Sequence, residues 1–311
     1  MAEEPKNMPM EFTSMAPGRD VVLTIGVFDG VHLGHRHLAQ QVMRRAQELH
    51  CLSGIITLHP HPRAVLTGNG PRYLVTLDER LALLRGLGLD IVTALPFTLE
   101  LARLSALEFM DLICQHLRLR ELWVGPDFAL GHRREGSATR LTEIGRELGY
   151  QVHVVPPLVL EGQTVSSTLI RNLVWQGQVE AAARLLRRRH HVSGTVMPDG
   201  QGGRRLGFPV ANVVVADGLA LPADGVYAAY AWLGSRQWPA RAYAGISFAG
   251  AEWRLVVQTP GLADDLNGQS LRLEFVRRLR SDARSISSEV LTSQFDTITK
   301  LTKKEVRRKT C

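Results

Sequence analysis

Apolar and polar positions in residues 21–189 follow two periods that predict strands separated by helices. The run VVLTIGVF at 21–28 is continuously apolar and rich in β-branched residues, which is typical of a strand buried on both faces of a sheet. Further strands are predicted at 53–58, 90–97, 121–125 and 151–157, and helices at 37–49, 77–87, 106–117 and 142–148. Because strands that alternate with helices of this length build a parallel sheet, we predict one doubly wound α/β domain over residues 21–189.

The pattern changes near His190. Short apolar segments then alternate with Gly, Pro and Asp, at 192–197, 209–215, 225–233, 241–248, 253–259 and 270–279. Such spacing is typical of a small antiparallel β-barrel. We therefore predict a second domain over residues 190–311 that ends in a polar helix at about 285–308, and a flexible N-terminus over residues 1–20.

Composition and charge narrow the class of partner. The chain has 311 residues, of which 45% are hydrophobic and 22% charged, as in a globular protein of two domains. Its net charge of +7 suits anionic partners. The basic residues are scattered and lack interleaved aromatics, and the densest cluster, Arg184 with 187–189, ends a helical pattern. We therefore expect anionic small molecules as partners and no nucleic acid.

The cysteines and the apolar runs indicate the compartment. The three cysteines, Cys51, Cys114 and Cys311, do not have the spacing of metal ligands, and an odd number of cysteines does not suggest a disulfide framework. This cysteine usage favours a reducing environment. The first 20 residues lack the apolar core of a signal peptide, and no uncharged apolar run reaches the length that spans a membrane. We expect a cytoplasmic protein without a membrane partner, and the sequence predicts no oligomeric state.

The most informative segment, GVFDGVHLGH at 26–35, joins the first strand to the first helix. A helix that begins there presents unpaired backbone N–H groups and a positive dipole end to a phosphate chain, and glycines allow close backbone approach. His32 and His35 are three residues apart and can donate hydrogen bonds to the same phosphates. The spacing differs from a Walker loop and from the dinucleotide fingerprint. The other residues expected to bind the nucleotide here are Gly26, Phe28, Asp29, Gly30 and Gly34.

A second phosphate-binding pattern reads VSSTLIR at 165–171. Hydroxyl groups at the start of a helix cap its N–H groups and can point donors outward, and an arginine one turn later can bind a phosphate with two hydrogen bonds. The residues expected to bind the nucleotide here are Ser166, Ser167 and Thr168, with Arg171 contacting the phosphates. Taken alone, this pattern equally fits an ordinary helix cap beside a surface arginine.

Together the two patterns resemble the signature of the HxGH nucleotidyltransferases. These enzymes catalyse attack on the α-phosphate of a nucleoside triphosphate, with release of pyrophosphate. That family has a GxFDGxHxGH turn and a later (I/V)SSTxxR element, in the order found here. The resemblance implies ATP as a substrate, Mg²⁺ as an assisting ion, and His32, His35 and Arg171 as catalytic residues that stabilise charge on the triphosphate. Such chemistry requires mainly positioning and charge neutralisation from the protein.

Two further segments resemble prokaryotic FAD synthetases, the adenylylating half of the bifunctional riboflavin kinase/FAD synthetase family. They are LWVGPDFALGHRREG at 122–136 and TLHPHPR at 57–63. The resemblance implies FMN as the acceptor and FAD as the product. It also implies a loop shaped by Arg134 and Gly136. It assigns four residues to flavin binding, namely Asp127, Phe128, His61 and Arg63. Of these, Asp127 and Phe128 would contact either the flavin or the adenine.

The acceptor is less firmly implied than the triphosphate chemistry. Leu58 stands where the family usually has Phe, and His59 where an acidic residue is common. Loss of an aromatic ring at position 58 could weaken stacking on a flavin. A nucleotidyltransferase that acts on a modified flavin or another acceptor therefore stays open as an alternative.

The second domain resembles the family's riboflavin kinase, with landmarks at 194–212, 224–230 and 265–280. In that family a PTAN element supplies a Thr hydroxyl and an Asn to Mg²⁺ and ATP, and a Glu serves as the base. Here the element reads PVAN, so Val210 replaces the Thr and Asn212 is kept, and counting without gaps puts Val256 at the Glu position. A valine can neither ligate a hard cation nor accept a proton. We therefore predict a degenerate kinase site.

These observations leave three readings beside an FMN adenylyltransferase whose kinase-like domain is inactive. The first alternative is a fully bifunctional riboflavin kinase and FAD synthetase. The others are a nucleotidyltransferase with another acceptor or another triphosphate, and a flavin sensor without enzymatic activity. The complete set of phosphate-binding residues opposes the sensor, since a binding protein does not need a charge-stabilising array. Val210 and Val256 oppose the bifunctional enzyme.

Overall fold

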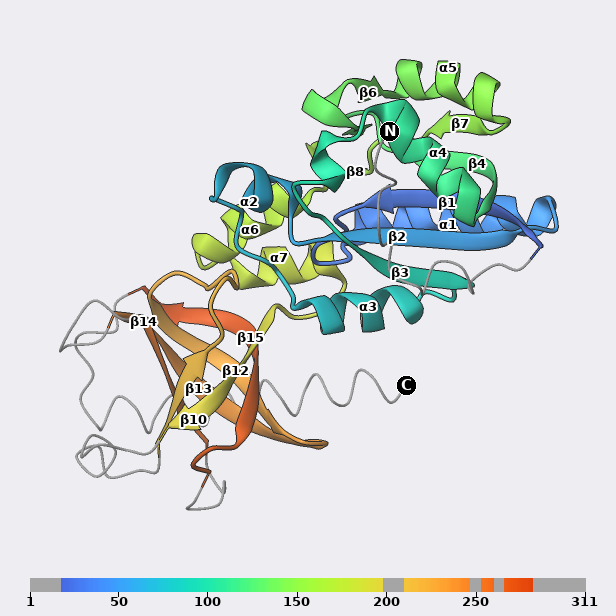
Figure 1. Ribbon diagram of the computed structural model, residues 1–311. Coiled ribbons are helices and arrows are strands. Elements are labelled where there is room, and N and C mark those ends of the chain that lie inside the picture. Colours follow the sequence, from blue (N-terminus) through green and yellow to red (C-terminus); the bar gives the residue numbers. More distant parts are fainter. Residues whose placement is uncertain (1–17, 198–209, 247–252, 260–265, 282–311) are drawn as a thin grey trace. The chain divides into compact units, whose positions relative to one another are not determined.

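The computed structural model describes residues 18–197, 210–246, 253–259 and 266–281 (Figure 1). The chain forms two compact units. The first comprises Met1–Pro71 and Thr76–Ser167, and the second comprises Arg72–Val75 and Thr168–Cys311. Most of the predicted flexible N-terminus and the whole predicted C-terminal helix lie outside the described residues.

The first unit is built on a five-stranded parallel sheet with the order β3-β2-β1-β4-β7. Its strands are β1 (Asp20–Gly26), β2 (Leu52–His59), β3 (Ile91–Pro96), β4 (Arg118–Val124) and β7 (Gln151–Val154). The helices of this unit are α1 (Leu33–Glu48), α2 (Pro62–Thr67), α3 (Leu77–Arg85), α4 (Ala106–His116) and α5 (Ala138–Leu148), with 3-10 turns η2 (Leu101–Arg103) and η3 (His132–Arg134). Two short hairpins complete it, β5 (Ala129–Leu130) with β6 (Gly136–Ser137) and β8 (Val159–Leu160) with β9 (Gln163–Thr164).

Helices cover both faces of this sheet, because successive side chains of a strand point to opposite faces. Leu23 and Ile25 of β1 belong to the core cluster that contains Met110 of α4 and Ile144 of α5. Val22 belongs to the cluster formed by α1 and α3 on the other face. The predicted doubly wound α/β domain is therefore confirmed.

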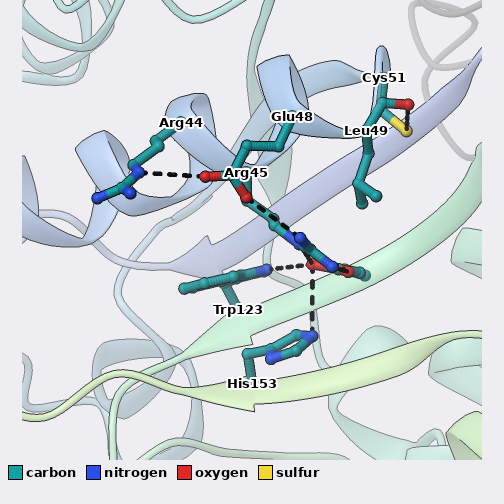
Figure 2. A network of polar contacts seen from close by, with 8 residues as sticks. Arg44, Arg45, Glu48, Leu49, Cys51, Trp123 and His153 are labelled. Carbon is teal, nitrogen blue, oxygen red and sulfur yellow. Dashed lines mark hydrogen bonds and ion pairs between the residues drawn. The ribbon is translucent and has the colours of Figure 1, made fainter.

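Helix α1 is fixed to the sheet near its C-terminal end by an ion pair (Figure 2). Arg45 Nη2 donates to Glu121 Oε1 of β4 at 3.0 Å, and Trp123 Nε1 donates to Glu121 Oε2 at 2.9 Å. His153 stacks on Trp123, and its Nε2 lies 3.3 Å from the same carboxylate. Burial raises the pKa of Glu121, but the hydrogen bonds from Arg45 and Trp123 outweigh it and lower that pKa below its ordinary value. Glu121 is thus a buried, ionised anchor for α1.

The strand order reverses beside β1. The chain adds β2 and β3 on one side of β1 and then adds β4 and β7 on the other. In open α/β sheets, ligands bind beyond the carboxyl ends of the strands where the order reverses in this way. A ligand site is therefore expected among the residues that follow β1 and β4.

The second unit contains a closed barrel with the strand order β10-β11-β14-β13-β12-β15. The strands are β10 (His191–Met197), β11 (Val210–Val215), β12 (Gly225–Leu233), β13 (Arg236–Ile246), β14 (Trp253–Gln258) and β15 (Ser270–Arg280), and neighbours are antiparallel. Helix α7 (Val179–Leu186) belongs to this unit, as does α6 (Ser167–Trp175) from its second residue onward. The predicted antiparallel barrel is confirmed, and each predicted strand is found, although β13 begins at Arg236 rather than at residue 241.

Several boundaries differ from the predicted ones for local reasons. Strand β1 ends at Gly26, because Phe28 has a φ of 51° and leaves the extended conformation. Helix α1 begins at Leu33 rather than at residue 37, because His32 supplies its N-cap. The short helix α2 and the two small hairpins were not predicted, since segments this brief carry little periodicity. Among the described residues, no helix is long and apolar enough to cross a membrane.

Candidate active site

The turn between β1 and α1 is tightly folded at the carboxyl edge of the sheet. Phe28, Gly30 and Val31 all have positive φ values, of 51°, 80° and 41°, and the N–H of Val31 donates to the carbonyl of Phe28 at 3.1 Å. Phe28 and Asp29 are buried. A valine with positive φ is uncommon, so the surrounding structure holds this turn in a strained conformation.

The two predicted histidines meet at the start of α1. His32 is the N-cap, and its Nδ1 accepts a hydrogen bond of 3.4 Å from the backbone N–H of His35. The two rings stack, with centroids 3.6 Å apart and planes 20° apart. The edge of Phe28 packs against His35 with a centroid distance of 5.2 Å. Because Nδ1 of neutral His32 accepts, its ring proton is on Nε2, which is then a donor.

The turn leaves no room for larger residues at two of its glycines. A Cβ atom at Gly34 would lie 3.1 Å from the Val165 carbonyl oxygen and 3.2 Å from the His32 ring. A Cβ atom at Gly26 would lie 3.1 Å from the ring of Phe28. Gly34 therefore permits the turn, the histidine pair and the segment before α6 to pack together.

The two predicted phosphate-binding patterns come together at this point. Ser167 Oγ donates to the carbonyl oxygen of Asp29 at 2.9 Å, although the two residues are 138 positions apart in the sequence. Ser166 is half-buried beside it, and Ser167 begins α6 as predicted. The hydrogen bond couples the start of α6 to the turn.

Thr168 and Arg171 follow Ser167 in α6 and group with the second unit. Thr168 is exposed. Arg171 is half-buried, and its Nε donates to the carbonyl of Arg72 at 2.7 Å, another residue of the second unit. The backbone carbonyl therefore holds the guanidinium in place.

The residues predicted to bind the flavin lie beyond the carboxyl ends of β2 and β4. His61 is the N-cap of α2, where its Nδ1 accepts from the N–H of Arg63 at 3.1 Å, and the side chain of Arg63 is exposed. Asp127 is exposed, whereas Phe128 packs against the sheet core. The structure thus puts both pairs at the same edge of the sheet as the turn.

The loop after β4 is held as the sequence suggested. Arg134 Nη2 donates to the carbonyl oxygen of Asp127 at 3.1 Å. Gly136 is buried, and a Cβ atom there would lie 2.7 Å from the Cβ of Ala106. Arg134 and Gly136 therefore both shape this loop.

One buried residue of this edge was not predicted from the sequence. Arg80 of α3 is fully buried, and its Nη1 donates to the carbonyl of Val27 at 2.9 Å and to that of Leu58 at 3.2 Å. Burial lowers the pKa of nearby His59, and the charge of Arg80 lowers it further. The sequence signal for a buried Arg80 was its position four residues before Leu84, which puts both residues on the same, inward face of α3.

The barrel brings two of the predicted kinase residues side by side. Asn212 of β11 pairs directly with Val256 of β14, and Val210 pairs with Gln258. Their neighbours Ala211, Val213, Leu255 and Val257 belong to the barrel core. Since strand residues alternate between faces, Asn212 and Val256 share the outer face, where both are half-buried. The register therefore puts an aliphatic side chain beside Asn212.

Comparisons with known proteins agree with this division. Residues 15–169 match the family model of FAD synthetase, and residues 186–305 match that of riboflavin kinase. The bifunctional riboflavin kinase/FMN adenylyltransferase of Escherichia coli K12 is 33% identical over 286 residues, which cover 90% of this chain and 91% of that protein. The protein of the same name from Pseudomonas fluorescens is 34% identical and covers 88% and 89% of the two chains.

A crystal structure from Streptococcus pneumoniae, named a macrolide-efflux protein, has a TM-score of 0.82 and 26% identity, and the match covers 94% of this chain and 96% of that one. The relatives therefore match both units and the order in which they occur. Together with the paired histidines at the start of α1, this likeness over nearly the whole length identifies the family. The chain belongs to the bifunctional riboflavin kinase/FMN adenylyltransferase family.

Proposed function

We propose that this chain transfers the adenylyl group of ATP to FMN and releases FAD and pyrophosphate. The observation that carries the proposal is the stacked pair His32 and His35 at the N-terminus of α1, with Ser167 bonded to the same turn. We assign this reaction to residues 21–189 and the kinase-like barrel to residues 190–311. The relatives named above are the basis for FMN as the acceptor.

The reaction needs stabilised charge more than covalent chemistry from the protein. A phosphate oxygen of FMN attacks the α-phosphorus of ATP, and a new P–O bond forms. The bond from that phosphorus to the bridging oxygen breaks, and pyrophosphate leaves with the electron pair. His32 at Nε2 and His35 donate hydrogen bonds to phosphate oxygens, and the N–H groups at the start of α1 add positive potential. The family resemblance is the basis for assigning Arg171 to the triphosphate as a further source of positive charge.

The same residues suit Mg²⁺ that arrives with the nucleotide. Among the described residues, no group of three or more His, Cys, Asp or Glu side chains could hold a metal ion alone. Mg²⁺ is commonly held by substrate phosphates with one or two carboxylates. The buried Asp29 in the turn is the carboxylate that we assign to this role. When bound, the ion would neutralise charge on the triphosphate.

Riboflavin phosphorylation is the second candidate function, and the comparisons favour it. The riboflavin kinase model matches residues 186–305, and the relatives from E. coli and P. fluorescens are both named bifunctional. The comparisons thus support a bifunctional enzyme better than a single-function one. Loss of kinase activity is our hypothesis, because Val210 stands at the Thr position and Val256 pairs with Asn212 and offers no base there.

One assay tests both activities. The full chain is incubated with ATP and Mg²⁺ and either FMN or riboflavin, and pyrophosphate release is followed while chromatography separates the flavins. FAD from FMN, with no FMN or FAD from riboflavin, would support adenylyl transfer and the loss of kinase activity. FMN or FAD from riboflavin at ordinary enzymatic rates would establish the bifunctional alternative. No product from either flavin would overturn the proposal and direct the search to other acceptors, other triphosphates or a sensor.

A further inference from the structure

Arg80 is an unusual residue because it is a fully buried arginine at the carboxyl edge of the sheet. Burial of a guanidinium is costly unless hydrogen bonds compensate for the lost water. A capping box holds the start of its helix, since Glu79 N–H donates to Thr76 Oγ1 and Thr76 N–H donates to Glu79 Oε2, both at 3.3 Å. The side chain therefore projects inward from a fixed helix.

Its contacts join the ends of two neighbouring strands. Arg80 Nη1 donates to the carbonyl of Val27 at 2.9 Å, and it lies 3.2 Å from both Thr57 Oγ1 and the carbonyl of Leu58. Thr57 Oγ1 in turn donates to the Val27 carbonyl at 2.7 Å. The Val27 carbonyl thus accepts from both side chains.

These carbonyls lie where two chain segments leave the sheet. Val27 follows the last paired residue of β1, because the β1–β2 register ends with Gly26 opposite Thr57. The next residues form the phosphate-binding turn with Phe28 at a φ of 51° and Gly30 at a φ of 80°. Leu58 and His59 end β2, and His61 follows as the N-cap of α2. Arg80 and Thr57 therefore extend the hydrogen-bonded connection between β1 and β2 by one residue beyond the last backbone pair.

We infer that Arg80 is a positioning residue for adenylyl transfer. It fixes the Val27 carbonyl and with it the turn that carries His32 and His35. This role rests on the proposed function, since it assigns the turn to the triphosphate. A shift of about 1 Å in such a group can lower a rate about a hundredfold. The loss is expected in kcat rather than in KM for ATP, because the backbone N–H groups of α1 still bind phosphate in the ground state.

Arg80→Met keeps much of the apolar volume and removes the donors, and Arg80→Lys keeps one charged donor group. We expect Arg80→Met to lower kcat about 10- to 100-fold with KM for ATP changed by less than about threefold, and Arg80→Lys to recover part of the loss. The matched control is Arg85→Met, an exposed arginine of the same helix, which should behave as wild type. A folded Arg80→Met variant with kcat within about twofold of wild type would overturn the inference.

Thr57 gives a second test if Arg80→Met does not fold. Thr57→Val removes the hydroxyl that bonds Val27 and should lower kcat about three- to tenfold, whereas Thr57→Ser should restore it. Equal kcat values for Thr57→Val and Thr57→Ser would refute a role for the hydrogen bond from Thr57 to the Val27 carbonyl.

A readout without acceptor separates this inference from the proposed function. In Arg80→Met, hydrogen exchange at the backbone amides of residues 28–32 should accelerate, including the Val31 N–H that bonds Phe28, while α5 is unaffected. If wild type makes no FAD, the proposed function fails, and this exchange measurement still decides the structural role of Arg80. Unchanged exchange in the turn would refute that role.

Discussion

The turn between β1 and α1 and the outer face of the barrel differ in whether the residues that build the fold are also the candidate functional residues. In the turn, His32 is both the N-cap of α1 and a candidate catalytic group, and Gly34 both closes the turn and approaches the His32 ring. In the barrel, Ala211 and Leu255 build the core, while Asn212 and Val256 lie on the outer face. Residues on the outer face of the barrel can therefore change without loss of core packing, whereas changes at His32 or Gly34 disturb both the fold and the candidate site.

The largest effect is expected from restoring a base to the barrel. Val256→Glu, combined with Val210→Thr to restore a hydroxyl, puts a carboxylate beside Asn212. If the missing base limits the reaction, riboflavin phosphorylation should rise about 10²- to 10⁴-fold over wild type. The measurement is FMN formed from riboflavin and ATP, separated by chromatography.

Val214→Glu is the matched control, because Val214 lies on the same strand face as Asn212 and is exposed. It should give no kinase activity. If the double variant is no faster than wild type, the valines do not explain the difference between the two regions. A wild-type chain that already phosphorylates riboflavin at an ordinary rate would show that another residue acts as the base.

The next effect concerns the histidine pair. His35→Ala removes a donor and should lower adenylyl transfer about 10²- to 10³-fold with little change in stability. His32→Asn should lose activity similarly but keep the N-cap, whereas His32→Ala should also lose about 1 kcal/mol of unfolding free energy. Initial rates of pyrophosphate release and urea unfolding measure the two properties.

His37→Ala is the control in the same helix, and it should retain wild-type activity. Near-normal turnover in His35→Ala would mean that the phosphate site lies elsewhere. If His32→Asn and His32→Ala are equally stable, the N-cap does not contribute to stability. The candidate catalytic residues of the turn would then be separable from the fold, as those of the barrel face are.

Much of this contrast could be predicted from the sequence, because periodicity reports what faces a core. The strands of both units and the paired histidines follow from apolar runs and from spacing after β1. Arg80 was not predicted although it lies four residues before the buried Leu84, because an arginine in an amphipathic helix is expected on the solvent side. Two of its partners are backbone carbonyls, which carry no residue signature. The hydrogen bond between Ser167 and Asp29 was equally hidden, because it joins segments 138 residues apart.

A smaller effect is expected at Arg171, whose role is inferred from the SSTLIR pattern. Arg171→Lys replaces a planar guanidinium with a point charge and loses the Nε bond to the Arg72 carbonyl. We expect kcat/KM for ATP to fall about tenfold, as for the loss of one charged hydrogen bond. Arg184→Lys, at an exposed position of α7, is the control. Equal kcat/KM in the two variants would return Arg171 to the role of an ordinary surface residue.

The smallest effect on catalysis, with a measurable effect on stability, is expected at Glu121. Its pKa is lowered in the folded protein, so its contribution to stability is present above the pKa of the unfolded chain and is lost as the pH falls through the folded value. Glu121→Gln should therefore lower the unfolding free energy at pH 7 by about 1–3 kcal/mol, and the difference from wild type should shrink well below pH 4. Urea unfolding at the two pH values measures this dependence.

This last variant tests whether fold and chemistry are separable within the first unit itself. Glu121 holds α1 near the end opposite the histidines, so kcat should change less than about twofold at temperatures where the variant is folded. Glu48→Gln, which removes the more exposed partner of Arg45, should change stability much less. If Glu121→Gln lowers kcat as far as His35→Ala does, then the position of the turn depends on the whole length of α1. In that case no residue of α1 could be changed for stability without also changing catalysis. The barrel face would then be the region of the two where residues can change without effect on the fold.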